Sequence, residues 1–474
     1  MAIERAAHTV TVRSTRTGEE TSIPYDTLVL SMGAAPVRPP IPGYDRVRTL
    51  RTVEDAARLA SDVDVAPTKA VVIGAGFNGL ELAENLIGQG IAVTLVEAAP
   101  QVLPPLDPEM AILVLDELVA HGVRVETGAT VASVEDRAVT LADGRVVPAD
   151  VVVGAIGVRP DVRLAEAAGI TLGPSGGIAV NAANQTNDPD VYAVGDAVEK
   201  PDAVSHAASL IALANVANRQ GRRVADHIAG RPIHPVESLG TAIVKVFDLV
   251  AATVGWNERR LRAAGRAYRA IHSHPFSHAT YYPGAAQMAA KLIFCPESGA
   301  ILGAQIVGAE GVDKRIDVIA TAMAGGITAE RLADLELAYA PPFSSAKDPV
   351  NMLGYMAENV RSGDCDVVDA RDLDELVADG WTLLDVRTHT EHAAGAIPGS
   401  VNVPIDSLRE QLDTLDRGPV VVYCAVGQRG HTATALMHEL GFRVRNLDGG
   451  YKAWTAAQRA QDLVDRAERN APTR

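Results

Sequence analysis

Two short stretches of this sequence combine residue types that can carry out chemistry. The first is Cys424-Ala-Val-Gly-Gln-Arg429, which follows the apolar run Val420-Val-Val-Tyr423 and precedes a helical pattern that begins near His431. Backbone N–H groups at a helix N-terminus and a nearby guanidinium both favour the thiolate, the nucleophilic form of cysteine. The same N–H groups can hold the outer sulfur of a persulfide. The pattern predicts a sulfur-handling loop; the alternative is an inert buried cysteine at a strand end.

The second stretch is the glycine-rich turn Gly74-Ala-Gly-Phe-Asn-Gly79. It follows an apolar strand pattern and opens a helical pattern, which is the arrangement of a dinucleotide site. In such a site Gly74 permits the tight turn, Gly76 lets a pyrophosphate approach the backbone, and Gly79 lets the helix pack close to the sheet. The helix N-terminus adds free N–H groups and a positive dipole end. The alternative is a purely structural turn.

An acidic residue indicates which nucleotide this turn would bind. Glu97 ends the next strand pattern and lies 97 − 74 = 23 residues after Gly74. Its carboxylate can accept hydrogen bonds from both hydroxyls of an adenine ribose. The following residues, Ala98-Ala-Pro-Gln101, contain no arginine that could meet a 2′-phosphate. The sequence therefore predicts NADH, with NADPH the less favoured cofactor.

The elements around these stretches contain an internal repeat. Pro24 to Pro36 and Pro148 to Pro160 both begin Pro-x-Asp, continue as an apolar strand, and end in Gly-x-x-Pro, with Gly33 and Gly157 equivalent. One nucleotide-binding module used twice explains this pattern. The second copy's glycine turn starts 157 − 74 = 83 residues before Gly157, and 33 − 83 = −50 lies upstream of Met1. We expect the chain to begin inside its first module; the alternative is a degenerate half-repeat that never had the turn.

Composition limits the functional classes. The length of 474 residues predicts three or four domains, and the formal charge of −16 argues against nucleic acid or an anionic membrane as the main partner. No apolar run approaches the roughly 18 residues of a membrane span. The three cysteines, odd in number and far apart, argue against a disulfide framework and favour a reducing cytoplasm.

The histidines show no metal-ligand spacing backed by cysteine or carboxylate, so we expect no metal site. His272 and His274 alternate on one strand face and could bind a metal, but satisfied or surface histidines are the favoured interpretation. Farther along the first module, the strand that ends in Gly195-Asp196 places a carboxylate beside a glycine. This aspartate can approach a ribityl or ribose hydroxyl closely. The alanine- and arginine-rich terminus from Ala456 predicts a solvated helix.

At this point the motifs resemble a known family. Residues 1–360 resemble the FAD-dependent pyridine nucleotide-disulfide oxidoreductases, especially the coenzyme A-disulfide reductase branch. The segments that carry this resemblance are Tyr25–Pro36, the glycine turn, Val191–Asp196, Leu239–Asp248 and Tyr339–Phe343. Residues from about 370 resemble a rhodanese domain, through Leu384–Arg387, Glu391-His392, Gly395–Asn402 and the Cys424 loop.

The resemblance implies an α/β fold with two Rossmann-like, three-layer ββα nucleotide-binding domains, the first incomplete, an α+β dimerisation domain and an α/β rhodanese domain. The expected segments are a remnant of the FAD domain (1–66), the NAD(H) domain (67–160), the second part of the FAD domain (161–235), the dimerisation domain (236–358), a linker (359–371) and the rhodanese domain (372–474).

Roles for single residues follow from the same resemblance. Gly33 and Asp196 would touch FAD, with Gly195 beside Asp196, and Asn218 would lie on the helix beside the flavin. Tyr339 would reach across a homodimer toward the partner's disulfide-reducing site, although a plain strand-end aromatic is the alternative. Asp385 and Arg387 would order the sulfur loop, with Arg429 beside it, and sulfur would pass through Cys424.

The sequence also departs from the family. Members open with a glycine fingerprint for the FAD pyrophosphate and a Ser-Phe-x-x-Cys-Gly stretch with the redox cysteine, and neither occurs here. Cys295 is predicted in a hairpin turn and Cys365 in the linker, so neither can replace it. We therefore expect an N-terminally truncated chain, in which FAD binding is an open question.

Three functions remain in view. The first is an FAD-dependent NADH reductase of disulfides or persulfides fused to a rhodanese sulfur carrier. Its substrates would be coenzyme A disulfide or persulfide and a thiosulfate-like donor. Electrons would pass either to the Cys424 persulfide on a swinging domain or to coenzyme A persulfide. The second is a rhodanese-type sulfurtransferase with a vestigial, flavin-poor reductase part. The third is a non-catalytic NADH-binding redox sensor.

Overall fold

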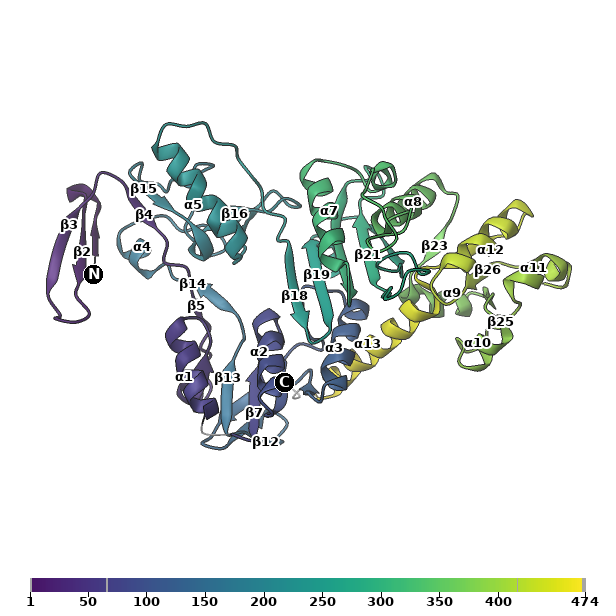
Figure 1. Cartoon of the computed structure of the whole chain (residues 1–474), viewed down its shortest axis with the longest axis horizontal. Coiled ribbons are helices and arrows are strands. Elements are labelled where there is room, and N and C mark those ends of the chain that lie inside the picture. Colours follow the sequence, from purple (N-terminus) through teal and green to yellow (C-terminus); the bar gives the residue numbers. More distant parts are fainter. Residues whose placement is uncertain (1, 65–66, 416, 471–474) are drawn as a thin grey trace. The chain divides into compact units, whose positions relative to one another are not determined.

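The structure, a computed structural model, describes residues 2–64, 67–415 and 417–470 (Figure 1). The chain forms two compact units: residues 1–66 with 153–242, and residues 67–152 with 243–474. Among the described helices, none combines the length and the apolar character that crossing a bilayer requires.

The first unit is built around two parallel strands, β4 (Leu28–Leu30) and β15 (Val191–Ala193), which pair from Leu28 with Val191 to Leu30 with Ala193. Both runs are apolar; β15 is buried throughout, whereas in β4 only Leu30 is buried. The unit's other elements are β1 (Ala2–Glu4), β2 (Thr9–Arg13), β3 (Glu20–Pro24), η2 (Tyr44–Arg46), β6 (Arg48–Thr49), α1 (Val53–Asp64), α4 (Arg163–Ala167), η3 (Gly195–Ala197), β16 (Glu199–Pro201), β17 (Ala208–Leu210) and α5 (Ala214–Ile228).

The C-terminal ends of the two repeated segments, 24–36 and 148–160, lie side by side in this unit. β5 (Ala34–Pro36) and β14 (Val158–Pro160) pair antiparallel. The N–H of Val37 donates to the carbonyl of Gly157 at 3.0 Å, and the N–H of Asp161 donates to the carbonyl of Gly33 at 3.0 Å. Both glycines have positive φ, +69° and +98°, which turns the chain sharply after each strand. β14 belongs to the predicted NAD(H) domain of residues 67–160, yet it pairs within the first unit.

The second unit begins with a nucleotide module, residues 67–152. Its parallel strands β7 (Lys69–Ile73), β8 (Ala92–Val96) and β9 (Arg124–Glu126) pair in that order. Helices α2 (Phe77–Gly88) and α3 (Pro108–Ala120) connect them. An antiparallel meander completes the module: β10 (Val131–Val134), β11 (Ala138–Leu141) and β12 (Val146–Pro148), followed by the start of β13 (Val151–Gly154).

The antiparallel domain, residues 243–362, contains a five-stranded sheet in the order β18-β19-β22-β21-β20. The first two strands of this domain, β18 and β19, are separated by a reversal of the chain at Phe247 and Asp248. The elements are β18 (Ala242–Val246), β19 (Leu249–Gly255), α6 (Glu258–Ala263), β20 (Arg269–Ser273), β21 (Ala289–Phe294), β22 (Ile301–Gly308), α7 (Val312–Ala324), η4 (Glu330–Asp334) and α8 (Pro349–Ser362).

The C-terminal domain, residues 366–470, has a parallel sheet in the order β23-β27-β26-β24-β25. The segment 359–371, expected as a linker, is structured, because α8 runs to Ser362 and β23 pairs with β27. The elements are β23 (Val367–Val368), η5 (Ala370–Asp372), α9 (Leu373–Ala378), β24 (Thr382–Asp385), α10 (His389–Ala393), β25 (Val401–Asn402), α11 (Ile405–Gln411), η6 (Leu412–Thr414), β26 (Val420–Tyr423), α12 (Gln428–Glu439), β27 (Val444–Leu447) and α13 (Gly450–Asn470).

Helix α13 is not the solvated helix that the sequence suggested. It begins at Gly450 and packs along α3 of the nucleotide module (Figure 1), where Leu463 and Val464 meet Ile112 and Leu115. The guanidinium of Arg459 also forms a bidentate ion pair with Asp116. The C-terminal domain is therefore held against the nucleotide module, which differs from the swinging arrangement considered above.

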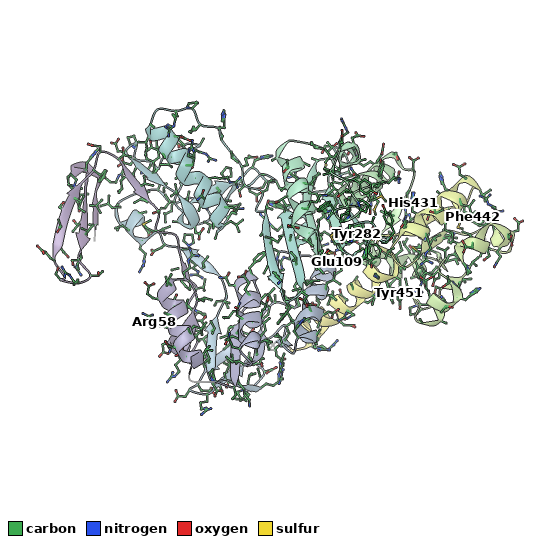
Figure 2. All side chains as sticks on the ribbon, viewed as in Figure 1. Arg58, Glu109, Tyr282, His431, Phe442 and Tyr451 are labelled. Atoms are coloured by element: carbon green, nitrogen blue, oxygen red, sulfur yellow. The ribbon has the colours of Figure 1, made fainter. Side chains whose placement is uncertain are left out.

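The three parts of the second unit meet at a buried cluster that we call the charge junction: Asp107, Glu109, Glu258 and Lys291. The Lys291 ammonium is fully buried on β21 and lies 2.9 Å from Asp107, 2.5 Å from Glu258 and in contact with Glu109. Figure 2 labels Glu109, near the N-terminus of α3. Arg371 of the C-terminal domain donates to Glu258 at 2.5 Å.

Replacing Lys291 with methionine tests this junction. The substitution keeps the length of the side chain but leaves three buried carboxylates without their common cation, which we expect to cost about 3–5 kcal/mol of unfolding free energy. Thermal and urea unfolding measure the loss. Lys245→Met, on the exposed face of β18, is the matched control. Equal stabilities of the two variants would contradict the importance of the junction.

Candidate functional site

The glycine turn opens the nucleotide module's helix as predicted. β7 ends at Ile73, Gly74 has φ of +104°, and α2 begins at Phe77 with Gly76 as its N-cap. No side chain caps the helix, and a Cβ built on Gly76 would meet no atom within 4 Å. Gly79 is buried within α2. Open backbone at a helix N-terminus suits an anionic pyrophosphate.

Glu97 lies against this turn. One carboxylate oxygen accepts the N–H of Ala75 at 2.7 Å, and the other accepts the N–H of Ala99 at 2.8 Å. The first bond ties the end of β8 to the glycine turn itself. Each oxygen has a further lone pair, so the carboxylate can still accept from ribose hydroxyls. The structure thus brings together Glu97 and the glycines, which the spacing predicted to act on one nucleotide.

In the first unit, Gly33 and Asp196 share one edge of a sheet. Gly33 follows β4 and Gly195 follows the parallel strand β15, with φ of +69° and +80°. Arg51 connects the two ends: its Nη2 donates to Asp196 at 2.8 Å and lies 3.5 Å from a Cβ built on Gly33. Sequence reasoning missed Arg51, because no motif marks it.

Helix α5 packs beside this edge. The N–H of Gly195 donates to the buried side chain of Gln220 at 2.9 Å, whereas the predicted Asn218 is exposed on the same helix. The buried Lys200 donates to the carbonyls of Gly195 at 2.7 Å and Val198 at 2.9 Å. Burial lowers the pKa of Lys200 to about 8, although Asp196 acts in the opposite direction.

These residues fit the flavin that the sequence suggested. Gly33 and Gly195 contribute no side chains of their own to the sheet edge, and the carboxylate of Asp196 can accept from a ribityl hydroxyl. Arg51 carries a positive charge at the same edge, which suits a phosphate group. Gly157, whose carbonyl accepts from Val37, belongs to the paired connector beside Gly33.

The sulfur loop is enclosed by secondary structure. Cys424 is fully buried at the end of β26, and α12 starts at Gln428, three residues earlier than the sequence suggested, with Gly427 as its N-cap at φ +89°. The side chain of Asn446 donates to the carbonyl of Gly427 at 3.2 Å. Asn446 was not predicted, since its strand carries no motif. The result is a short loop whose N–H groups lead into a helix N-terminus.

Arg429 forms a bidentate pair with Glu391, at 2.8 and 2.6 Å. Glu391 is itself part of the capping box of α10, where it accepts from Thr388. The hydrogen bond to Glu391 is the main cause of a raised pKa of Arg429, and the neighbouring Cys424 acts in the same direction. The same pair lowers the pKa of Glu391 to about 2, so the carboxylate is charged at neutral pH. The guanidinium is thereby fixed beside the loop.

Asp385 and Arg387 form a second, buried pair, with Nη2 of Arg387 at 2.7 Å from the carboxylate. Arg387 also donates to the carbonyl of Gly395 at 2.7 Å, and its guanidinium lies 4.3 Å from the ring centre of Tyr451. Burial raises the pKa of Asp385, but hydrogen bonds from Arg387 and His392 outweigh it and leave the pKa below its usual value. This pair links the segment after β24 to Gly395 and to Tyr451 at the start of α13.

The remaining candidates lie in the antiparallel domain. Tyr339 is exposed, and its hydroxyl lies 2.9 Å from that of Tyr281, which the sequence did not single out. Cys295 lies in the β21–β22 turn, as predicted, and its pKa is lowered by hydrogen bonding to Ser298. Cys365 is buried after α8, and burial raises its pKa to about 11. None of the three cysteines forms a disulfide within the described residues.

Replacing Gly76 with alanine tests whether the glycine turn binds the nucleotide, without a large effect on protein stability. The backbone there has φ of −81° and open space, so we expect the melting temperature to change little. The new methyl group would occupy the approach of the pyrophosphate, and we expect NADH to bind at least about tenfold more weakly, roughly the worth of one or two hydrogen bonds. Titration calorimetry measures the NADH affinity of the wild type, of Gly76→Ala and of the control Gly88→Ala, which lies at the exposed end of α2. Unchanged NADH affinity of the Gly76 variant would contradict the assignment.

Comparisons with known proteins follow the same division of the chain. The family model for pyridine nucleotide-disulphide oxidoreductases matches residues 1–221, and the model for the dimerisation domain of that family matches residues 241–349. The model for the rhodanese-like domain matches residues 356–457.

Curated relatives cover most of the reductase part. Coenzyme A disulfide reductase of Staphylococcus haemolyticus is 34% identical over 364 residues, 76% of this chain and 82% of that protein. NADH oxidase of Methanocaldococcus jannaschii is 37% identical over 348 residues, 71% of this chain and 76% of that protein.

Two solved structures match nearly the whole chain. Reduced CoADR-RHD of Bacillus anthracis has 44% identity and a TM-score of 0.95, covering 97% of this chain and 84% of that one. The NAD-dependent persulfide reductase from A. fulgidus has 38% identity and a TM-score of 0.88, covering 96% and 84%. With this fold, this order of domains and these relatives, the chain belongs to the pyridine nucleotide-disulphide oxidoreductases, in the coenzyme A-disulfide reductase branch with a C-terminal rhodanese domain.

Proposed function

We propose that this chain reduces small sulfur compounds with NADH and carries sulfur on Cys424. The observation that supports this most is the Cys424 loop, which joins a strand end, a helix N-terminus and the fixed guanidinium of Arg429. Such surroundings stabilise a thiolate and the terminal sulfur of a persulfide. In the same chain, the nucleotide module provides the residues for a dinucleotide.

The nucleotide is NADH rather than NADPH. Glu97 lies at the ribose end of the glycine turn, and its negative charge disfavours a 2′-phosphate. Residues 98–101 offer no cation to compensate. Gly74, Gly76 and Gly79 would accommodate the pyrophosphate at the start of α2.

FAD, when bound, would supply the two-electron carrier between nicotinamide and sulfur. Gly33, Gly195 and Asp196 would hold it, with Asn218 on the adjacent helix. Arg51 is paired with Asp196 in this structure, so its guanidinium would have to share or exchange that carboxylate with a ribityl hydroxyl. Lys200 and Gln220 would keep the Gly195 turn in place through their hydrogen bonds.

The sulfur chemistry is a transfer followed by a reduction. The Cys424 thiolate attacks the outer sulfur of a thiosulfate-like donor, forms the S–S bond of a persulfide and releases sulfite. A thiol acceptor such as coenzyme A then takes the outer sulfur and leaves the thiolate. The reduction consumes that product: R–S–SH with NADH and H⁺ gives R–SH, H₂S and NAD⁺. Coenzyme A disulfide would give two thiols by the same electron count.

The working form is a homodimer in a reducing cytoplasm. The antiparallel domain matches the family's dimerisation domain and exposes Tyr281 and Tyr339 as a hydrogen-bonded pair. Tyr339 would then face the partner's reducing site. The free cysteines are consistent with a reducing compartment.

Spectroscopy with both cofactors tests the reductase. We expect the purified chain with FAD to be yellow, to bleach under NADH, and to oxidise NADH when coenzyme A persulfide or disulfide is added, with NADPH much slower. A colourless protein that transfers sulfur without consuming NADH would support a sulfurtransferase with a vestigial reductase part. A melting temperature raised by NADH without turnover would support a sensor.

Replacing Cys424 with serine tests the carrier. A hydroxyl cannot form a persulfide, so we expect thiocyanate formation from thiosulfate and cyanide to fall to background. Affinity for NADH should not change, because the nucleotide turn is untouched. Cys295→Ser and Cys365→Ser are the controls and should keep the transfer. Full sulfur-transfer activity of the Cys424→Ser variant would contradict the proposed role of this residue.

A further inference from the structure

A buried histidine of the antiparallel domain lies between two carboxylates from other parts of the second unit. His272, on β20, is only 7% exposed. Its Nδ1 is 2.6 Å from Asp448 of the C-terminal domain, and its Nε2 is 3.1 Å from Glu109 of the nucleotide module. Its backbone N–H also donates to Asp448 at 2.9 Å. Both ring nitrogens donate, so the imidazole is a cation rather than the metal ligand that the His272–His274 alternation allowed.

Asp448 directly precedes the turn that lies against the sulfur loop. Gly449 and Gly450 have φ of +65° and +63°, two successive left-handed residues that only glycine adopts readily. A Cβ on Gly450 would clash with the carbonyl oxygen of Cys424 and lie 2.7 Å from the N atom of Gly427. A Cβ on Gly449 would lie 2.9 Å from that of His272. One turn of backbone therefore separates His272 from the sulfur loop.

The same turn leads into hydrogen bonds that hold the loop. The N–H of Tyr451 donates to the carbonyl of Cys424 at 2.8 Å, and the N–H of Lys452 donates to that of Ala425 at 3.1 Å. These donors are the first residues of α13 after the two glycines (Figure 2, Tyr451). Only Gly449 and Gly450 separate Asp448 from Tyr451, so a displacement of Asp448 is passed to these donors over a short stretch of backbone.

His272 is in turn held by the charge junction. Glu109, which accepts from His272, also contacts Lys291, and Lys291 is fixed by Asp107 and Glu258. Burial lowers the pKa of His272, but Asp448 and Glu109 outweigh it and raise the pKa to about 10. The positive charge therefore persists across the working pH range.

We propose that His272 and Asp448 are positioning residues for the sulfur loop, so that the antiparallel domain sets the geometry at Cys424 from outside the domain that carries it. The consequence for sulfur transfer rests on the proposed role of Cys424. The positioning itself does not, because it acts on the backbone carbonyls of the loop.

A pair of amide variants at His272 separates geometry from charge. The amide nitrogen of asparagine reaches the place of Nδ1, and that of glutamine the place of Nε2. Both variants remove the charge and keep the backbone N–H bond to Asp448, but only His272→Asn also keeps the side-chain bond to that carboxylate. Asp448→Asn removes the carboxylate at constant size, and His278→Asn, a buried histidine bonded to Ser277 and Pro283, is the control.

Two readouts on the full chain decide the proposal. The first is the rate of Cys424 alkylation by iodoacetamide, resolved by mass spectrometry from Cys295 and Cys365. The second is the kcat and KM of thiocyanate formation from thiosulfate. For His272→Gln and Asp448→Asn we expect several-fold faster alkylation, because the buried loop opens, and a kcat about tenfold lower at unchanged KM, the factor of one charged hydrogen bond. For His272→Asn we expect an alkylation rate and a kcat within about twofold of the wild-type values.

The proposal is overturned if His272→Asn and His272→Gln behave alike, or if Asp448→Asn alkylates at the wild-type rate. His272→Gln and Asp448→Asn each test the proposal against the wild type, so if one of them does not fold the other remains decisive: wild-type alkylation and kcat in the folded variant overturn it. If the wild-type chain forms no thiocyanate from thiosulfate, Cys424 is not a sulfur carrier. The alkylation rates of the variants would still decide whether His272 and Asp448 position the loop.

Discussion

The second unit depends on one buried ammonium group. Removing Lys291 from water is costly, and it is tolerable only because carboxylates from α3 and α6 close around it. Asp107 and Glu109 of the nucleotide module share this lysine with Glu258 of α6. The nucleotide module and the antiparallel domain therefore need each other's charges to pack, and Arg371 brings the C-terminal domain into the same arrangement. The sequence suggests separate domains, but buried ion pairs join these three into one unit.

The sulfur site inherits its order from this assembly. The Cys424 loop takes its N–H groups from α12, its guanidinium through α10, and its carbonyl partners from the start of α13. The N–H groups and Arg429 itself are local in sequence, whereas Glu391, which fixes the guanidinium, and the start of α13 are not. The packing of α13 on α3 then makes the C-terminal domain part of the reductase body.

The two nucleotide cradles use one device in both units. A parallel strand ends in a glycine with positive φ, and a carboxylate stands beside that end: Glu97 in one cradle and Asp196 in the other. Glycine supplies the turn and the open backbone, and the carboxylate offers oxygens that can accept from hydroxyl groups. The paired connectors after Gly33 and Gly157 show that the repeat seen in the sequence is also a repeat in space.

The sequence alone determined what depends on neighbours along the chain. The glycine turn with Glu97, the repeat, and the Cys424 loop all lie within short segments, where strand, turn and helix preferences act locally. The sequence alone did not identify several residues of these sites: Arg51, Gln220, Tyr281, Asn446 and the His272–Asp448 pair. Each acts on residues tens or hundreds of positions away, and an isolated arginine or histidine carries no periodic signal. Only the tertiary structure decided them, because burial of a charge selects its partners by distance in space.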